Sequence, residues 1–269
     1  MDIAARVRLA SISKANRIYN SIISMTDIYE SDKILSEYLL FHFGNRDEIL
    51  TDDFSWPAGM TDSLEFPVRT VAYFSKAPAE RGLDLGCAVG RSTFEMARNC
   101  QEVVGIDFSH AFINAAEAMR RGDTVFYDRH DEATRVTRLA AHLPDGSDGA
   151  KLSFLQGDAM NLADDIGIFD RVHAANLLCR LTEPEKLLAR LPHLVKPGGE
   201  LVLATPCTWL EEFTPPENWP ATGTFEWLIA TLSPSFSLVK RANEPFLIRE
   251  TARKFQWTTS LVTVWQRHD

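Results

Sequence analysis

The sequence predicts an α/β fold with a mostly parallel sheet, and three observations lead to this prediction. Residues 83–90 read LDLGCAVG, an apolar run that passes into two glycines, and residues 92–98 have the composition of an amphipathic helix start. A second apolar run, at 102–107, ends on a carboxylate. Further apolar runs at 154–156 and 169–176 follow in order, and a Pro-Gly-Gly turn introduces a fifth within 194–204. Strands that alternate with helices are typical of a parallel sheet.

The turn at Gly86 and Gly90 predicts a nucleoside site. Glycine has no Cβ, so the backbone can bend sharply there and a ligand can approach closely. Asp107 follows ~20 residues later, where a Rossmann-like fold places the acid that accepts hydrogen bonds from a ribose diol. We expect Phe108 and Ser109, which follow directly, to lie at the same site. The alternative is an ordinary strand, turn and helix of some other α/β protein.

The spacing of the glycines indicates which nucleoside is bound. A dinucleotide site has the pattern G-x-G-x-x-G, because a pyrophosphate lies against bare backbone. Here three residues separate Gly86 from Gly90, and Asp84 would repel a phosphate but suits a ligand with an ammonium and a sulfonium group. The segment resembles motif I of class I S-adenosylmethionine-dependent methyltransferases, D-x-G-x-G-x-G, with Ala88 at the middle glycine. This resemblance implies that Asp84, Gly86, Ala88 and Gly90 bind S-adenosylmethionine.

Later segments fit the same resemblance. Residues 157–159 read Gly-Asp-Ala, where this superfamily binds adenine; Asp158 is expected to accept from the exocyclic amine and Ala159 to contact the ring. A capping role in the turn is the alternative for Asp158. Asn176 ends the fourth strand and is a candidate contact of the methionine amine or the acceptor ring, or else a helix cap. Arg91 would reach the cofactor carboxylate or remain a surface cation.

Composition limits the partners of the chain. Its 269 residues, 45% of them hydrophobic, suffice for one large α/β domain with a helical cap. A net charge of −9 argues against nucleic acid, because binding to phosphates needs Lys and Arg, and a small acceptor is therefore expected. The scattered cysteines predict reduced thiols, with neither a disulfide framework nor a metal site. They are Cys87, Cys100, Cys179 and Cys207.

The chain divides into a cap and a core. Residues 1–80 form the predicted N-terminal helical cap, with an amphipathic helix in the first twenty-odd residues, one from Ser31 or Asp32, and one around 66–74. No apolar run is long enough for a signal or a membrane span, so we expect a cytoplasmic protein without a membrane partner.

The predicted core covers 81–269 and carries insertions at 121–150 and 206–222. The second insertion lies just past the fifth strand, where open α/β sheets bind ligands, and is the expected roof over an acceptor. Segments 236–240 and 255–265 alternate like strands and would form a closing hairpin that adds one antiparallel strand.

Four segments carry a closer resemblance. They are residues 31–44, 83–92, 174–181 and 208–215, with the sequences SDKILSEYLLFHFG, LDLGCAVGRS, AANLLCRL and TWLEEFTP. They resemble the methyltransferase domain of the ovothiol-pathway enzyme 5-histidylcysteine sulfoxide synthase/4-mercaptohistidine N1-methyltransferase, and the last two are specific to that family. No H-x-x-x-H-x-E iron motif occurs among the seven histidines. The resemblance implies a stand-alone enzyme that methylates the π nitrogen of 5-thiohistidine to ovothiol A, beside a separate sulfoxide synthase.

A zwitterionic acceptor of this kind needs an anchor for each charge. Arginine offers a planar fork to a carboxylate, and an acid can hold an ammonium group or take a ring proton. For each candidate a structural role stays open: core packing for rings, salt bridges or solvation for charged groups. The expected acceptor contacts are Tyr38, His42, Arg180, Trp209, Glu211 and Glu212, and the expected catalytic residues are Asn176, Arg180 and Glu211.

Two other functions remain open at this point. One is a methyltransferase for a different amino-acid-like or heteroaryl acceptor, which the cofactor motifs permit equally. The other is a non-catalytic S-adenosylmethionine-binding protein, against which the polar roof argues. A dehydrogenase fits less well, because neither Asp84 nor the glycine spacing suits a pyrophosphate.

Overall fold

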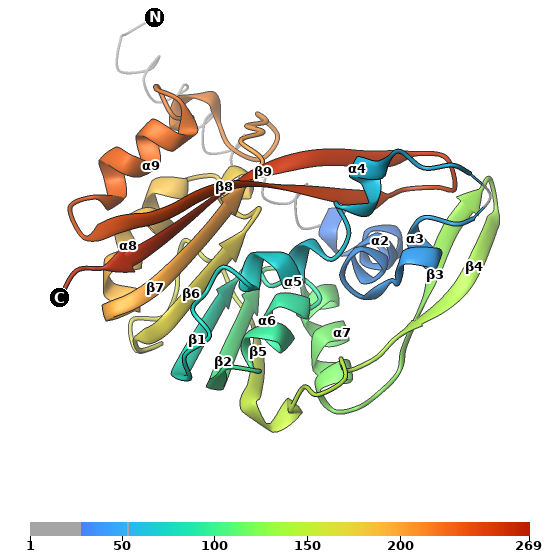
Figure 1. Cartoon of the computed structure of the whole chain (residues 1–269), viewed down its shortest axis with the longest axis horizontal. Coiled ribbons are helices and arrows are strands. Elements are labelled where there is room, and N and C mark those ends of the chain that lie inside the picture. Colours follow the sequence, from blue (N-terminus) through green and yellow to red (C-terminus); the bar gives the residue numbers. More distant parts are fainter. Residues whose placement is uncertain (1–27, 53) are drawn as a thin grey trace, which may run out of the picture.

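A seven-stranded sheet forms the centre of the molecule in the order β5-β2-β1-β6-β7-β9-β8 (Figure 1). The computed structural model describes residues 28–52 and 54–269, so the helix expected in the first twenty-odd residues lies outside the described residues. Strand β9 runs antiparallel to both neighbours and the other pairings are parallel, which confirms the expected sheet. The strands are β1 (Ala79–Leu85), β2 (Cys100–Asp107), β5 (Leu152–Gln156), β6 (Phe169–Ala175), β7 (Val195–Thr205), β8 (Phe236–Arg249) and β9 (Phe255–Arg267).

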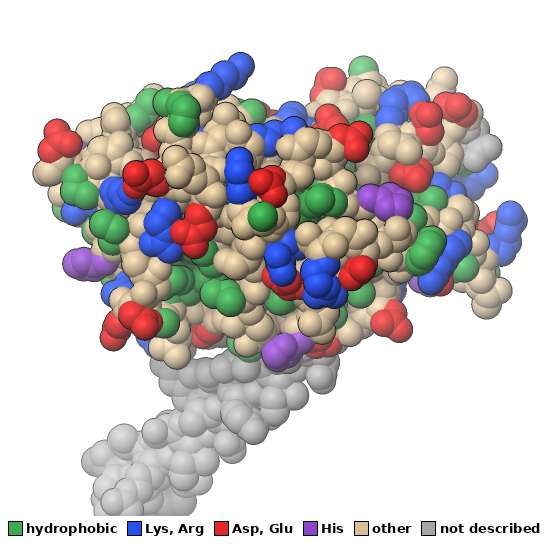
Figure 2. Space-filling model, turned by 90° about the horizontal axis from the view of Figure 1, so that it is seen from below, with side chains coloured by type: hydrophobic (Ala, Val, Ile, Leu, Met, Phe, Trp, Pro, Cys, Tyr) green, Lys and Arg blue, Asp and Glu red, His purple; other side chains and the backbone are tan. Residues whose placement is uncertain are grey.

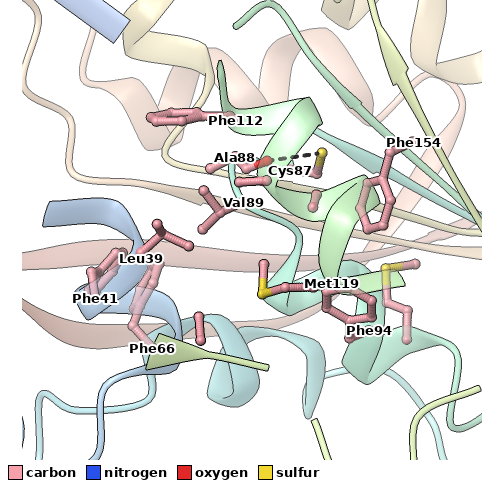
Figure 3. Packing of buried hydrophobic residues seen from close by; sticks show 14 of the residues in the cluster. Leu39, Phe41, Phe66, Cys87, Ala88, Val89, Phe94, Phe112, Met119 and Phe154 are labelled. Carbon is pink, nitrogen blue, oxygen red and sulfur yellow. Dashed lines mark hydrogen bonds between the residues drawn. The ribbon is translucent and has the colours of Figure 1, made fainter. Parts of the chain in front are cut away.

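Helices cover the sheet on both faces, and each face has its own apolar cluster. One cluster joins the sheet to α2, α5, α6 and α7, and the other joins it to α8 and α9. The glycine turn belongs to the first, and Figure 3 shows Ala88 and Val89 in it, with Leu39 and Phe112 close by. The helices are α2 (Asp32–Phe43), α3 (Arg46–Ile49), α4 (Ala58–Thr61), α5 (Phe66–Val71), α6 (Arg91–Met96), α7 (His110–Arg120), α8 (Pro184–Leu194) and α9 (Thr224–Leu232), with 3-10 turns η1 (Gly149–Lys151), η2 (Leu178–Arg180) and η3 (Pro216–Asn218).

Helix α2 begins where the sequence predicts. The Ser31 hydroxyl accepts a hydrogen bond from the Ile34 amide and so caps the helix. Leu39, Leu40 and Phe41 are buried, and the helix packs against β3 and β8. The cap therefore places one face of α2 over the end of the sheet.

The insertion at 121–150 contains an unexpected ribbon, β3 (Val125–Glu132) and β4 (Arg135–Ala141), which forms a separate antiparallel pair. Asp131 ties this ribbon to the end of the β8–β9 hairpin, because its carboxylate lies 2.8 Å from the Arg249 guanidinium and its carbonyl accepts from the Ala252 amide. Strand β8 extends to Arg249, well beyond the predicted 236–240, since it pairs with β9 along its whole length (Figure 1).

Acidic and basic side chains intermingle on the face of the molecule shown in Figure 2. No helix in residues 28–52 and 54–269 combines the length and the apolar content needed to cross a bilayer.

Candidate functional site

A cavity of about 470 Å³ lies at the carboxyl ends of the parallel strands. Strands β1, β2 and β6 and the turn after β5 supply one wall, and α2 with β8 and β9 supplies the other. Its volume lies within the range of small-molecule sites, and its position is where open α/β sheets bind ligands. The cavity therefore has a half formed by the parallel strand ends and a half formed by the cap.

The turn after β1 has the backbone conformation that close approach of a ligand requires. Gly86, Ala88 and Gly90 all have positive φ, at 68°, 48° and 91°. Gly86 and Ala88 line the cavity, whereas Gly90 does not. A Cβ on Gly90 would lie 2.7 Å from the Phe154 ring, so this glycine permits close packing of helix and sheet.

Asp107 sits at the end of β2 and faces the cavity. Its two oxygens accept hydrogen bonds from the Ala88 and Ser109 amides, each at 2.9 Å. Burial raises the pKa of this carboxyl to about 6, and the repulsion of Asp84 adds to the rise. Each carboxylate oxygen keeps a further lone pair, so the residue is held rigidly and can still accept from a ribose diol.

The neighbours of Asp107 have different roles. Phe108 lines the cavity with its side chain 44% exposed, as a ring that covers a flat ligand would be. Ser109 also lines the cavity, but its hydroxyl caps α7 by accepting from the Phe112 amide and donates to the Tyr29 carbonyl. Ser109 thus connects the cap to the end of β2.

The Gly-Asp-Ala segment also reaches the cavity. Asp158 and Ala159 both line it. Asp158 accepts from the Met160 amide at 2.9 Å through Oδ1, which is the turn-capping role weighed as its alternative. Asp158 therefore lines the cavity and caps the turn at the same time.

Asp84 is buried and already paired within the protein. Its carboxylate lies 2.8 Å from His173 Nδ1 and accepts from the Thr93 hydroxyl at 2.7 Å. The other ring nitrogen of His173 lies 3.1 Å from the Thr70 hydroxyl. Both Asp84 and His173 are about 1% exposed and line the floor of the cavity.

His173 is a site residue that sequence reasoning missed. Strands β1 and β6 are parallel neighbours, and their register places Asp84 directly beside His173. A histidine in an otherwise apolar strand was the available signal, but only the register shows which acid it faces. His173 therefore fixes the Asp84 carboxyl group in place, independently of any ligand.

Asn176 ends β6 with a positive φ of 57° and lines the cavity. Its Oδ1 accepts from the Ser260 hydroxyl at 2.7 Å. The amide NH₂ group is thus left as the donor side of Asn176. An amide held in this way can orient a ligand group through its N–H bonds.

Arg180 follows one turn later, in η2, and faces the cap half of the cavity. Its guanidinium lies 4.4 Å from the centre of the Phe213 ring, and Nη1 donates to the Cys179 and Thr208 carbonyls at 3.3 and 3.5 Å. Within the described ranges no carboxylate lies within ion-pair distance of this guanidinium. The side chain has donors left for an anion.

Aromatic side chains surround Arg180 on the cap side. Tyr38 packs against Phe112 with ring centres 4.8 Å apart and against the edge of Tyr29 with ring centres 6.2 Å apart. Burial raises the pKa of both tyrosines, so they are neutral. His42 lines the same half, its buried Nδ1 atom has no hydrogen-bond partner among the described residues, and burial beside Arg91 lowers its pKa to about 3. His42 is therefore a neutral imidazole and a poor base.

Several predicted site residues lie outside the cavity. Trp209 donates to the Thr224 hydroxyl and packs on Trp227, while Glu211 and Glu212 are exposed in the turn that follows. The expected roof still contributes, through Pro206, Thr208 and Leu210. The lining includes Leu210 but neither Glu211 nor Glu212, so neither glutamate is placed to contact an acceptor in the cavity.

Arg91 is also engaged elsewhere. Its guanidinium pairs with Glu95 at 3.0 Å and lies 5.8 Å from the centre of the Phe43 ring. It does not line the cavity, so the structure places Arg91 beside Glu95 and Phe43 and not in the cavity wall.

Comparisons with known proteins agree with this geometry. Residues 83–203 match the family described as "Methyltransferase domain". A demethylmenaquinone methyltransferase of Clavibacter sepedonicus is 25% identical over 198 residues, covering 74% of this chain and 64% of that protein. The chain spans between 41% and 64% of the length of the curated relatives that it matches.

Solved structures share the fold. The [4+2]-cyclase SpnF aligns with a TM-score of 0.56 and 16% identity, over 91% of this chain and 96% of that one. The N-methyltransferase NodS from Bradyrhizobium japonicum WM9, in complex with S-adenosyl-L-homocysteine, aligns with a TM-score of 0.51 and 17% identity, over 87% of this chain and 99% of that one. Residues 83–203, which include the glycine turn and Asp107 at the strand ends, thus match a methyltransferase domain family, and the solved structures share the fold of the chain.

Proposed function

We propose that this domain methylates a ring nitrogen of a small zwitterionic heteroaromatic amino acid, with 5-thiohistidine as the acceptor and ovothiol A as the product. The observation that carries the proposal is Arg180, a cation that faces the cavity that Tyr38 also lines and has no carboxylate partner within the described residues. An arginine fork suits a substrate carboxylate, and an aromatic wall suits a flat ring.

The family-specific motifs support the choice of acceptor. Asn176, Leu177, Arg180 and Leu181 of the motif at 174–181 line the cavity, as do Thr208 and Leu210 of the motif at 208–215. Residues of both motifs thus face the ligand space, although Trp209, Glu211 and Glu212 of the second do not.

Positioning is the main contribution of the chain to this reaction. When bound, S-adenosylmethionine supplies a methyl group on a sulfonium, and transfer requires an in-line approach of the acceptor nitrogen. Asp107 would hold the ribose, Arg180 the acceptor carboxylate, and the Asn176 NH₂ group an acceptor atom of the ring. The methionine ammonium is itself a donor and would need the Asn176 Oδ1 atom, which accepts from Ser260. The neutral His42 is too weak a base to take a proton. An acceptor ring made electron-rich by a thiolate suits a site of this kind.

Other acceptors are the second candidate. The Clavibacter relative is named for a quinone substrate, and an apolar quinone would need no cation in the cavity wall. Arg180 therefore favours an anionic or zwitterionic acceptor. A [4+2]-cyclase shares this fold, so the fold alone does not determine the reaction, and a turnover measurement decides it.

Turnover with defined acceptors tests the proposal. The purified protein is incubated with S-adenosylmethionine and 5-thiohistidine, with histidine as the control acceptor, and the products are weighed by mass spectrometry. A product heavier by one methyl group that forms only from the thiol is expected. Intact cofactor binding without any product would contradict the assigned acceptor and leave the domain assignment standing.

Replacing Arg180 by alanine is expected to raise the KM for the acceptor about 10- to 100-fold, because charge-assisted hydrogen bonds contribute about 1.5–3 kcal/mol. The Kd for S-adenosylmethionine should change less than about twofold. Steady-state kinetics and calorimetry give the two values. Arg135→Ala, at an arginine on β4 with 80% of its side chain exposed, is the matched control. Equal losses for both ligands would contradict an anchor for the acceptor.

The cofactor affinity should fall in mild acid. The pKa of Asp107 is raised to about 6, so the carboxylate that accepts from the ribose is lost as pH falls through that value. Binding favours the ionised form and should lower this pKa. We expect the Kd for S-adenosylmethionine to be flat above neutral pH and to rise about tenfold per unit well below pH 6. Calorimetry between pH 5 and about 8 checks this, and an affinity independent of pH would contradict it.

A further inference from the structure

The acid that should face the acceptor's ammonium group is not one of those expected from the sequence. Glu211 and Glu212 are exposed and lie outside the cavity. Five other carboxylates line it: Glu30, Glu37, Asp84, Asp107 and Asp158. The question is which of these remains available to a ligand in the cap half.

Four of the five accept hydrogen bonds that fix them in place. Glu30 accepts from the His110 and Ala111 amides at 2.7 and 3.0 Å and so caps α7. Asp84 holds His173, and Asp107 and Asp158 accept from backbone amides. Glu37 is different, since its Oε1 atom is buried and accepts no hydrogen bond within the described residues.

Glu37 lies on α2 with its side chain only 9% exposed. The Lys33 ammonium is 3.5 Å from Oε1, but 60% of the Lys33 side chain is exposed, so water screens much of this attraction. Burial raises the pKa of Glu37, and the nearby Glu250 adds to the rise. A buried carboxylate oxygen that makes no hydrogen bond is costly and marks a place for a donor.

The α2 residues that line the cavity beside Glu37 carry aliphatic or aromatic side chains. Ile34, Glu37 and Phe41 lie one turn apart on one face of the helix and all line the cavity. Ile248 of β8 lines the same cavity, and α2 packs against that strand. Glu37 thus supplies the acidic group of a cavity wall whose other side chains suit only a ring.

We propose that Glu37 binds the ammonium group of the acceptor, as the counterpart of Arg180, which takes its carboxylate. This inference rests on the proposed function, because it assigns the second charge of a zwitterionic acceptor. It also makes Glu37 a specificity-determining residue: acceptors without a cationic nitrogen lose this contact. A bound ammonium supplies the hydrogen bond that Oε1 lacks.

Probes that carry one charge each can separate the two anchors. Histamine has the ring and the ammonium group, and imidazole-4-propionate has the ring and the carboxylate. Their Kd values are measured by calorimetry on protein saturated with S-adenosyl-L-homocysteine. Glu37→Gln should weaken histamine about tenfold or more and leave imidazole-4-propionate within about twofold. Arg180→Ala should show the opposite pattern.

Two further variants serve as controls. Glu185→Gln removes an exposed carboxylate from α8 and should change neither probe. Glu37→Asp keeps the charge but withdraws it by one methylene, so its histamine affinity should fall between those of the wild type and Glu37→Gln. Thermal unfolding of every variant confirms that the fold is kept.

Three results would overturn the assignment. They are equal losses for both probes, which would mean that Glu37 contacts the ring; a loss of S-adenosyl-L-homocysteine affinity, which would place Glu37 at the cofactor; and unchanged histamine binding. Neither probe carries the ring thiol or needs turnover. A wild-type protein that fails to methylate 5-thiohistidine would therefore refute the proposed acceptor while the Glu37 measurement still gives its own answer.

Discussion

Asp107→Ala is expected to weaken S-adenosylmethionine binding by about two to four orders of magnitude. A carboxylate that accepts from both hydroxyls of a ribose makes two charge-assisted hydrogen bonds, each contributing about 1.5–3 kcal/mol. About 1.4 kcal/mol corresponds to a tenfold change in Kd, which gives the expected range. The same variant also releases the Ala88 amide, which Asp107 holds at 2.9 Å, so the glycine turn loses one of its fixed points.

Calorimetric titration with S-adenosylmethionine measures this loss, and thermal unfolding separates it from damage to the fold. Asp123→Ala is the matched control, because 59% of the Asp123 side chain is exposed beyond the end of α7. Asp107→Asn should fall between alanine and the wild type, since its amide oxygen can accept one hydroxyl. Binding of near-normal affinity in Asp107→Ala would remove the ribose role from this residue.

The sheet was predictable from the sequence because its central strands are apolar runs bounded by turn residues. Strands β1, β2, β5, β6 and β7 all contain the predicted runs, and Asp107 ends β2 as expected. The ribbon β3–β4 was not predictable, because it exposes the apolar residues Phe126 and Val136 beside charged ones and buries only Tyr127 and Ala141. Its tether is the contact of Asp131 with Arg249, which pairs residues 118 positions apart.

The cofactor half of the site was also better predicted than the acceptor half. Its residues follow directly from strand ends, and local spacing fixes where a strand ends. The acceptor half depends on how α2 lies across the sheet and on which way the 206–222 segment turns. Trp209 and the two glutamates that follow it were chosen from a motif, yet Trp209 packs on Trp227 while Leu210 lines the cavity. Glu37 was overlooked because it resembles any polar residue of an amphipathic helix.

His173→Leu is expected to destabilise the folded protein by about 1–3 kcal/mol, the cost of leaving a buried carboxylate oxygen without its hydrogen-bond partner. Asp84 would keep only the Thr93 hydroxyl as a side-chain partner, and its carboxylate would remain fully buried. A change of this size is a large part of the total stability of about 5–15 kcal/mol that folded domains have. Urea unfolding followed by circular dichroism measures it.

A double variant separates the pair from the packing of the histidine ring. The double variant Asp84→Asn/His173→Leu no longer buries a carboxylate without its partner. Its loss of stability should therefore be smaller than the sum of the losses in the two single variants. His193→Leu, at an exposed histidine of α8, should stay within about 0.5 kcal/mol of the wild type. Additive losses in the double variant would show that Asp84 and His173 contribute separately. A coupled loss would show that the two side chains stabilise the fold as a pair, in which His173 of β6 fixes the acid of the glycine motif at the floor of the cavity.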